Sequence, residues 1–361
     1  MSTIELKDVT KYFGSLAAVR DVDLSVGAGE TVCLLGPSGC GKTTTLRIVA
    51  GLEAASGGEV FIAGRRVNDL SPAERDIAMV FQFYALYPSL TVGENIAFPL
   101  YYERLSSADR ERRVRKAAET LDLTAVLGRL PGQVSEGEKQ RVAVARAIVR
   151  DPSCFLFDEP LSRLDVELRH TMRGQIKEVL TGLSKATVIV THDQLEALTM
   201  ADRIAIMRDG LIEQVASPHA IFAEPANVFV AGFIGTPQMN LIEATFAEVA
   251  EGEAELAFSD QRIRLPVNGA AAGLAGSKSM TFGVRPRAFS VAGAASEHTL
   301  SGSVELIEPM GAETLAHVRC GGLDIRVVVP REIRLKPGQV VHLACDPGQA
   351  HFFDADGRAV R

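Results

Sequence analysis

Short apolar runs recur along the first part of the chain, separated by segments whose apolar residues return every three to four positions. Runs that are apolar throughout are typical of strands buried on both faces of an open α/β sheet. Apolar stripes at helical spacing predict amphipathic helices at 107–121 and 166–183, and a shorter helix is expected at 193–201. The alternation predicts an α/β domain with a largely parallel sheet, with core strands at 31–35, 154–157, 187–190 and 204–207.

The pattern changes after about residue 235, where helical periodicity fades and short strand-like runs bounded by turn residues follow. This spacing predicts a small β-barrel domain with a Gly/Ala-rich loop at 268–277. We therefore expect an α/β domain over 1–235 and an all-β domain over 236–361. The clearest strands of the second domain are expected at 262–265, 282–284, 325–329 and 340–343.

Residues 36–43 carry the strongest chemical signal, since they read Gly-Pro-Ser-Gly-Cys-Gly-Lys-Thr and match G-x-x-x-x-G-K-[ST] at every fixed position,. Glycines let the backbone wrap phosphates and aim N–H groups inward, Lys42 adds positive charge, and Thr43 offers a hydroxyl to Mg²⁺. The helix that follows adds its positive N-terminal end. The candidate nucleotide-binding residues here are Gly36, Pro37, Ser38, Gly39, Cys40, Gly41, Lys42, Thr43 and Thr44.

Four polar side chains follow other expected strands. Asp158 would hold Mg²⁺ through its water shell, and Glu159 could polarise a water for attack on the γ-phosphate. His192 could donate a hydrogen bond to the γ-phosphate, and Gln82 could contact Mg²⁺ or the attacking water. The alternatives are solvated acids at a strand exit and a structural histidine.

Composition narrows the class of protein. The 361 residues are 47% apolar and 23% charged, as in globular proteins,. A net charge of −7 argues against broad binding of nucleic acid through phosphate contacts,. The five cysteines show no C-x-x-C spacing and are expected to be reduced thiols of a cytosolic protein,. No segment has the length and apolarity of a signal peptide or a membrane helix, so work at a membrane would require a partner.

Together the motifs resemble those of the ATP-binding subunits of ABC transporters, and more closely the ATPases of bacterial carbohydrate importers of the maltose-importer type. The resemblance covers nearly the whole chain. It is carried by the segments 36–43, 81–82, 84–88, 134–141, 157–160, 164–165, 190–193, 233–235, 239–240 and 283–286.

This resemblance implies a RecA-like core with a helical subdomain at about 88–152, followed by a small OB-like (TOBE) regulatory domain. It also implies ATP and Mg²⁺ as cofactors and import of a sugar, a polyol or a glycerol phosphate. The implied partners are two integral membrane permease subunits, a second ATPase subunit and, indirectly, an external solute-binding protein. The implied location is the cytoplasmic face of the cell membrane, as a peripheral protein.

The resemblance also assigns roles. Tyr12 would stack on adenine, for which a tyrosine face is suited, although a core tyrosine is the alternative. Gln82 would couple the nucleotide to the permease, which would dock near 84–88. Glu159 would be the general base and His192 the switch histidine. The resemblance also places Ser135, Gly137 and Asp165 at the dimer interface. Ser135 and Gly137 would close over the nucleotide bound to the opposite subunit, and Asp165 would lie in the loop that crosses the interface.

One segment departs from the family pattern. The family signature is Leu-Ser-Gly-Gly-Gln, whereas residues 134–138 read Val-Ser-Glu-Gly-Glu, and Arg163 stands where the family usually has asparagine. Carboxylates near a triphosphate cost Coulomb energy. The chain could therefore pair with a different ATPase subunit that carries a full signature, or form a homodimer in which Ser135 and Gly137 suffice. One alternative function is a soluble ABC ATPase without a transporter. Another is a regulatory subunit that binds ATP without hydrolysing it, but the presence of Glu159 and His192 argues against this second alternative.

Overall fold

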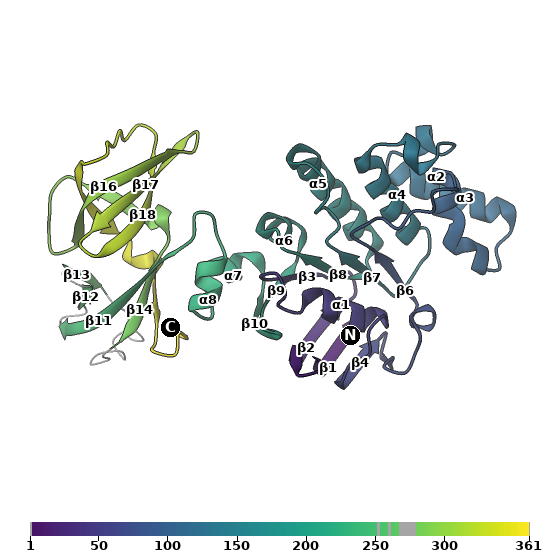
Figure 1. The fold of residues 1–361 in the computed structure, drawn as a ribbon, viewed down its shortest axis with the longest axis horizontal. Helices are drawn as coiled ribbons and strands as arrows, with labels where there is room; N and C mark the ends of the chain where they lie inside the picture. The colour runs from purple at the N-terminus through teal and green to yellow at the C-terminus, as the bar shows by residue number, and fades with distance from the viewer. Residues whose placement is uncertain (1, 251–252, 259–260, 267–278, 361) are drawn as a thin grey trace. The chain divides into compact units, whose positions relative to one another are not determined.

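The computed structural model describes residues 2–250, 253–258, 261–266 and 279–360, which form two compact units, Met1–His219 and Ala220–Arg361 (Figure 1). The loop expected at 268–277 lies outside the described residues. The boundary between the two units, after His219, comes earlier in the chain than residue 235, where the composition changes. The reason is local packing, since Val228 donates its N–H to the Gly357 carbonyl and Ala359 donates to Ala226.

The first unit is built on a six-stranded sheet of order β10-β9-β3-β8-β7-β6. All neighbouring strands run parallel except β10, which pairs antiparallel with β9. The core strands expected from the sequence are confirmed as β3, β7, β8 and β9. The bounds are β3 Thr31–Leu35, β6 Ile77–Val80, β7 Cys154–Asp158, β8 Ala186–Thr191, β9 Arg203–Arg208 and β10 Leu211–Ala216.

A second, antiparallel sheet of order β2-β1-β4-β5 was not predicted. Ile4 and Leu6 alternate with charged residues along β1 and are buried in one core with Leu46 of α1. Helix α1 thus lies between the two sheets, while α5 and α6 cover the other face of the parallel sheet (Figure 1). The strand bounds are β1 Ser2–Phe13, β2 Leu16–Gly27, β4 Gly57–Ile62 and β5 Arg65–Arg66.

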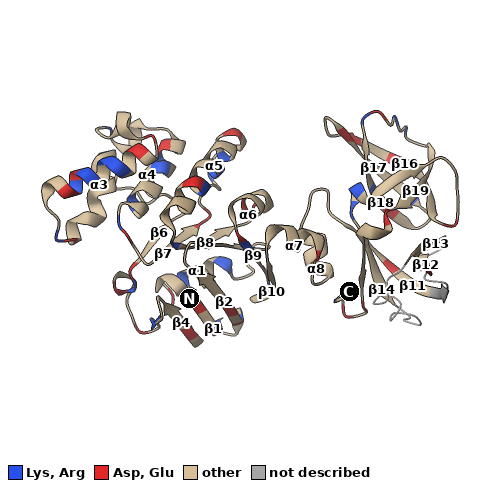
Figure 2. Ribbon diagram, turned by 180° about the vertical axis from the view of Figure 1, so that it is seen from behind, with Lys and Arg blue, Asp and Glu red and all other residues tan. Residues whose placement is uncertain are grey.

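The helical segment expected at about 88–152 contains α2, α3 and α4, grouped beside β6 (Figure 1). Ser106 caps α3 by accepting a hydrogen bond from the Asp109 N–H at 3.1 Å. Acidic and basic residues are mixed along α3 (Figure 2). Most of these charged residues are exposed, as expected for a solvated helix face. The helix bounds are α1 Lys42–Ala50, α2 Val92–Ala97, α3 Ser107–Thr120, α4 Glu136–Ile148, α5 Val166–Leu183, α6 Gln194–Met200, α7 Pro218–Ala223 and α8 Val228–Phe233. None of the helices within the described ranges has the length and apolarity needed to cross a membrane.

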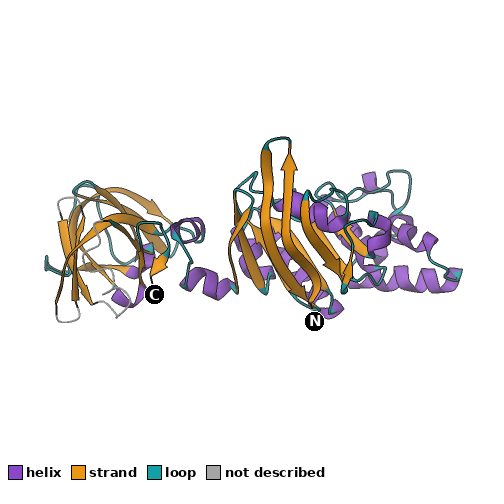
Figure 3. Ribbon diagram, turned by 90° about the horizontal axis from the view of Figure 1, so that it is seen from below, coloured by secondary structure: helices purple, strands orange, loops and turns teal. Residues whose placement is uncertain are grey.

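The second unit is β-rich, as expected (Figure 3). Two antiparallel sheets, of order β13-β12-β11-β14-β20-β21 and β15-β19-β16-β17-β18, enclose a common apolar core. Asn240 joins them, since its amide donates to the Arg326 carbonyl at 2.8 Å and accepts from the Arg326 N–H at 2.8 Å. The bounds are β11 Asn240–Ala250, β12 Glu253–Phe258, β13 Gln261–Pro266, β14 Met280–Val284, β15 Phe289–Ala292, β16 Thr299–Pro309, β17 Glu313–Cys320, β18 Leu323–Pro330, β19 Val340–Cys345, β20 Ala350–Phe353 and β21 Ala359–Val360.

A buried arginine ties α7 and α8 to this β unit. The Arg285 guanidinium donates to the Phe222 carbonyl at 2.6 Å and to the Ile234 carbonyl at 2.8 Å, and lies 3.5 Å from the centroid of the Phe222 ring. Burial lowers the pKa of Arg285 to about 10, so it remains charged at neutral pH. Gly235 passes so close that a Cβ there would lie 2.7 Å from the guanidinium.

We expect Arg285→Met to lower the free energy of unfolding by about 3 kcal/mol, because two charge-assisted hydrogen bonds are lost and two carbonyls keep no donor. Urea denaturation followed by circular dichroism measures the change. Arg331→Met, at an exposed position in the same unit, is the control. Equal stability of the two variants would contradict the role given to Arg285.

Candidate active site

The loop between β3 and α1 holds two glycines that cannot carry a side chain. Gly41 has a φ of 104°, and an added Cβ would overlap the carbonyl oxygen of Ala18. A Cβ on Gly36 would overlap the carbonyl oxygen of Met207. Gly41 is the N-cap of α1 and supplies no side-chain cap, so the helix presents its positive end to the loop,. The remaining loop candidates are Pro37, Ser38, Gly39 and Cys40, and Thr44 lies in the first turn of α1.

Lys42 is folded back over this loop and is only 6% exposed. Its Nζ donates to the carbonyls of Gly36 and Pro37, both at 2.8 Å, and lies 3.6 Å from the Cys40 sulfur. Within the described part of the chain, no carboxylate lies close enough to Nζ to form a salt bridge. A buried ammonium held by neutral acceptors attracts an anion strongly, because little around it cancels its charge.

Thr43 and Asp158 meet where α1 begins and β7 ends. The Thr43 hydroxyl donates to Asp158 Oδ1 at 3.2 Å. Burial raises the pKa of Asp158, while the Thr43 hydrogen bond and the Arg47 charge oppose that rise. Two oxygen ligands, one of them a buried carboxylate, suit a hard cation such as Mg²⁺, whose charge would offset the cost of burial. The donor set therefore fits a magnesium ion.

The structure brings Gln82, Glu159 and His192 together at the carboxyl edge of the sheet. Gln82 Nε2 donates to Glu159 Oε2 at 2.9 Å, and His192 Nδ1 lies 3.2 Å from Glu159 Oε1. The backbone directs this contact, since Glu159 has a φ of 47° and donates its N–H to the Val190 carbonyl at 2.9 Å. The carboxylate of Glu159 is thus held from both sides.

Sequence reasoning missed Ser162. Its hydroxyl donates to the Glu159 carbonyl at 3.0 Å and lies 3.4 Å from Gln82 Nε2. Its position three residues after Glu159, in a turn, was the available signal, because serine hydroxyls often bond to nearby backbone. Ser162 therefore helps to fix the position of Gln82 relative to Glu159.

Tyr12 lies at the surface and not in the core, since it is 51% exposed. It pairs with Ala17 across β1 and β2, and the carbonyl of the next residue, Ala18, faces Gly41. The core alternative for Tyr12 is wrong. Its ring is available for stacking near the phosphate-binding loop.

The altered signature begins α4 as a complete capping box. Ser135 is the N-cap, and its N–H and hydroxyl donate to Glu138 Oε2 at 2.7 and 2.8 Å. These contacts hold the pKa of the Glu138 carboxyl below its usual range. The pKa of Glu136 is also lowered, first by its 2.6 Å contact with Lys139. Both extra carboxylates thus have partners within their own helix.

Gly137 and Asp165 lie where α4 and α5 begin. A Cβ on Gly137 would be 2.9 Å from Leu168 of α5, so glycine allows the two helices to approach closely,. Asp165 caps α5 by accepting from the Leu168 N–H at 2.9 Å. Among the described residues, the recorded hydrogen bonds of Ser135 and Asp165 are with the starts of their own helices and not with the loop at 36–43.

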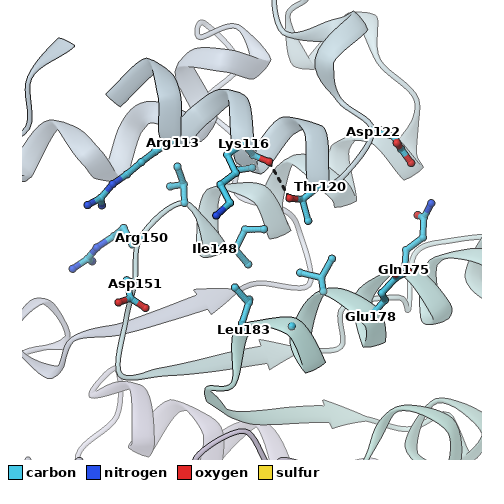
Figure 4. Close-up of a pocket in the computed structure, with 14 residues that line it drawn as sticks. Arg113, Lys116, Thr120, Asp122, Ile148, Arg150, Asp151, Gln175, Glu178 and Leu183 are labelled. Carbon is cyan, nitrogen blue, oxygen red and sulfur yellow. Dashed lines mark hydrogen bonds between the residues drawn. The ribbon is translucent and has the colours of Figure 1, made fainter. Parts of the chain in front are cut away.

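A separate pocket of about 700 Å³ lies between α3, the end of α4 and α5 (Figure 4). Its charged lining includes Arg113, Lys116 and Glu178. No residue predicted for the nucleotide site lines it. The pocket is therefore distinct from the candidate active site.

Comparison with known families matches segments in both parts of the chain. Residues 19–162 match the ABC transporter family, residues 235–289 the MalK OB fold domain, and residues 282–353 the TOBE domain. A solved structure described as a dimeric, post-hydrolysis state of the ATP-binding cassette MJ0796 bound to ADP and Pi is 34% identical. It matches with a TM-score of 0.54 and covers 60% of this chain and 98% of its own.

Full-length relatives are also similar. The trehalose/maltose import ATP-binding protein MalK of Thermococcus litoralis is 44% identical, with 100% of both chains covered. The sulfoquinovosyl glycerol transport ATP-binding protein SmoE of Agrobacterium fabrum is 45% identical, with 98% of each covered. The sn-glycerol-3-phosphate import ATP-binding protein UgpC 1 of Rhizobium johnstonii is 42% identical over 100% of this chain and 96% of its own. The chain belongs to the ABC transporter ATP-binding proteins of the MalK type, and it is an ATPase of an importer.

Proposed function

We propose that this ATPase drives uptake of a sugar or of a related solute such as a polyol or glycerol phosphate. The observation that carries the enzymatic part is the meeting of Gln82, Glu159 and His192. Asp158, the residue before Glu159, accepts a hydrogen bond from Thr43 of the loop at 36–43. The solute class is supported by the names of the similar proteins, which refer to trehalose/maltose, sulfoquinovosyl glycerol and sn-glycerol 3-phosphate.

In the proposed site, the loop at 36–43 and the start of α1 bind the phosphates of ATP, with Lys42 at the β- and γ-phosphates. Thr43, Gln82 and Asp158 would hold Mg²⁺, which supplies positive charge to neutralise the phosphates. Tyr12 stacks on the adenine. These residues bind and orient the nucleotide and leave its γ-phosphate exposed toward Glu159.

Glu159 acts as the general base. It orients a water molecule and accepts its proton while the water oxygen bonds to the γ-phosphorus and the bond to the β-phosphate oxygen breaks. Gln82 holds the carboxylate by its hydrogen bond to Oε2, and Ser162 holds the backbone of Glu159 through the carbonyl oxygen. His192 holds the γ-phosphate by a hydrogen bond. The products are ADP and phosphate.

We further propose that two nucleotide-binding domains close around ATP and pull on two permease subunits at the cytoplasmic face of the membrane. Ser135, Gly137 and Asp165 would face the nucleotide of the opposite subunit. The internal partners of Glu136 and Glu138 favour the homodimer, because Lys139 offsets the charge of Glu136 and the Ser135 hydrogen bonds hold the Glu138 carboxylate at its own helix start. A solute-binding protein outside the membrane would deliver the solute.

Co-purification from detergent-solubilised membranes tests the proposal. Two polytopic membrane chains and a second copy of this chain should accompany it. In proteoliposomes, ATP hydrolysis by that assembly should rise when binding protein and its sugar are supplied. Recovery with ribosomes or DNA and no membrane chain would support the soluble alternative.

We expect Glu136→Gly combined with Glu138→Gln to change ATP hydrolysis by the assembled transporter by less than about threefold. Glutamine preserves the capping box that Glu138 makes with Ser135, so the helix should form normally,. Single-turnover and steady-state rates of the reconstituted assembly measure the effect. A rise of tenfold or more would instead identify a degraded signature and favour a partner ATPase of different sequence.

A further inference from the structure

The turn that carries His192 is held by a network outside the nucleotide site. Thr191 and Asp193 flank His192, and the Asp193 N–H donates to the Thr191 hydroxyl at 3.0 Å. That hydroxyl donates in turn to Glu196 Oε2 at 2.7 Å. Glu196 is only 2% exposed, so the turn rests on a buried carboxylate.

Arg169, in the first turn of α5, also contacts this network. Its Nη1 donates to Asp193 Oδ2 at 3.2 Å, and its Nε lies 4.0 Å from Glu196 Oε1. It is a cation placed between two carboxylates, one of which is buried. Arg173 of the same helix lies farther away, with its Nη2 3.9 Å from Asp193 Oδ2. Arg169 is therefore the closer of the two cations to Asp193, and its loss would remove part of the positive charge beside both carboxylates.

The same guanidinium also contacts the turn that precedes α5. Arg169 Nη2 donates to the Leu164 carbonyl at 3.0 Å, directly before Asp165. Its neighbour Leu168 packs against Gly137 at the start of α4. One side chain therefore connects the turn at 164–165 to the turn of His192.

We propose that Arg169 is a positioning residue for hydrolysis, which sets His192 against Glu159 according to the position of the 164–165 turn. This inference rests on the proposed function of His192 and Glu159. Arg169 does not contact the nucleotide loop in any recorded hydrogen bond among the described residues. Its effect is therefore expected on the chemical step and not on ATP binding.

Arg169→Met in the assembled transporter tests this role. We expect kcat for ATP hydrolysis to fall about 10- to 100-fold, because a small displacement of a reacting group is costly. The KM for ATP and the Kd for Mg·ATP should stay within about twofold. Arg169→Lys, which keeps the charge but not the forked geometry, should recover part of the rate.

The matched control is Lys177→Met. Lys177 lies on the same helix and donates to the Thr199 carbonyl of α6 at 2.6 Å, but it does not touch the turn of His192 in any recorded contact. Its kcat should equal that of the unmodified chain. Melting temperatures of both variants show whether lost stability alone explains a lost rate.

A double-variant cycle shows whether Arg169 acts through His192. Once His192→Ala has removed the histidine, adding Arg169→Met should reduce kcat by less than about twofold more. The proposal is overturned if the double variant loses kcat by the product of the two single losses. It is also overturned if Arg169→Met leaves kcat unchanged or changes only KM. If His192→Ala is itself fully active, the proposed role of His192 fails, which is a separate result.

Discussion

Lys42→Ala is expected to weaken retention of Mg·ATP by about 100-fold, the loss that follows from removing a charge-assisted contact to phosphate. The ammonium is buried at 6% exposure and is held over the loop by the carbonyls of Gly36 and Pro37. Because the ammonium is already buried before ATP binds, little further free energy is needed to remove water from this charge. Equilibrium binding of radiolabelled ATP in the presence of Mg²⁺ measures the loss.

Two controls separate binding from folding. Lys185→Ala removes a lysine whose 2.8 Å contact with Asp151 lies away from the loop, and it should bind normally. Lys42→Ala should also retain its secondary structure, because the loop conformation depends mainly on the glycines. Equal retention of Mg·ATP by Lys42→Ala and the unmodified chain would exclude the proposed phosphate site.

Glu159→Gln is expected to leave binding of ATP within about threefold and to lower the rate of hydrolysis about 1000-fold. Glutamine matches glutamate in size and still offers an oxygen to Gln82 Nε2, which lies 2.9 Å away in the unmodified chain. It cannot accept the proton of the attacking water. Phosphate release by the reconstituted transporter, under single-turnover conditions, reports the chemical step.

Glu167→Gln is the control for loss of a carboxylate, since Glu167 is exposed in the first turn of α5. It should hydrolyse ATP at the normal rate. If the Glu159→Gln variant and the unmodified chain turn over equally slowly, the chain would be a regulatory ATP-binding subunit. If both turn over rapidly, another group is the base.

The nucleotide loop and the polar residues at the strand ends could be predicted, because each depends on residues that are adjacent in the sequence. The loop at 36–43 follows β3 and ends in the first turn of α1, as its spacing required. Asp158, Glu159 and His192 follow the apolar runs of β7 and β8, and the ends of neighbouring parallel strands lie at one edge,. Their proximity therefore followed from strand direction alone.

The parts that were missed depend on contacts between distant segments. The sheet of β1, β2, β4 and β5 forms because β1 pairs with β4, as in Ile4 with Ile62, which lie 58 positions apart. The packing of α7 and α8 on the β unit depends on Arg285, which follows them by some fifty residues or more. Neither signal lies in a local pattern of apolar residues.

The sequence by itself determined the nucleotide loop, the core strands and the acidic residues that follow them, since hydrophobic period and glycine placement act over a few residues. Only the tertiary structure decided which side chains steady them. It brought Ser162 to within 3.4 Å of Gln82 Nε2, and Arg169 to within 3.2 Å of Asp193 beside His192. Hydrogen bonds between segments far apart in sequence depend on three-dimensional distance, which a linear pattern does not contain.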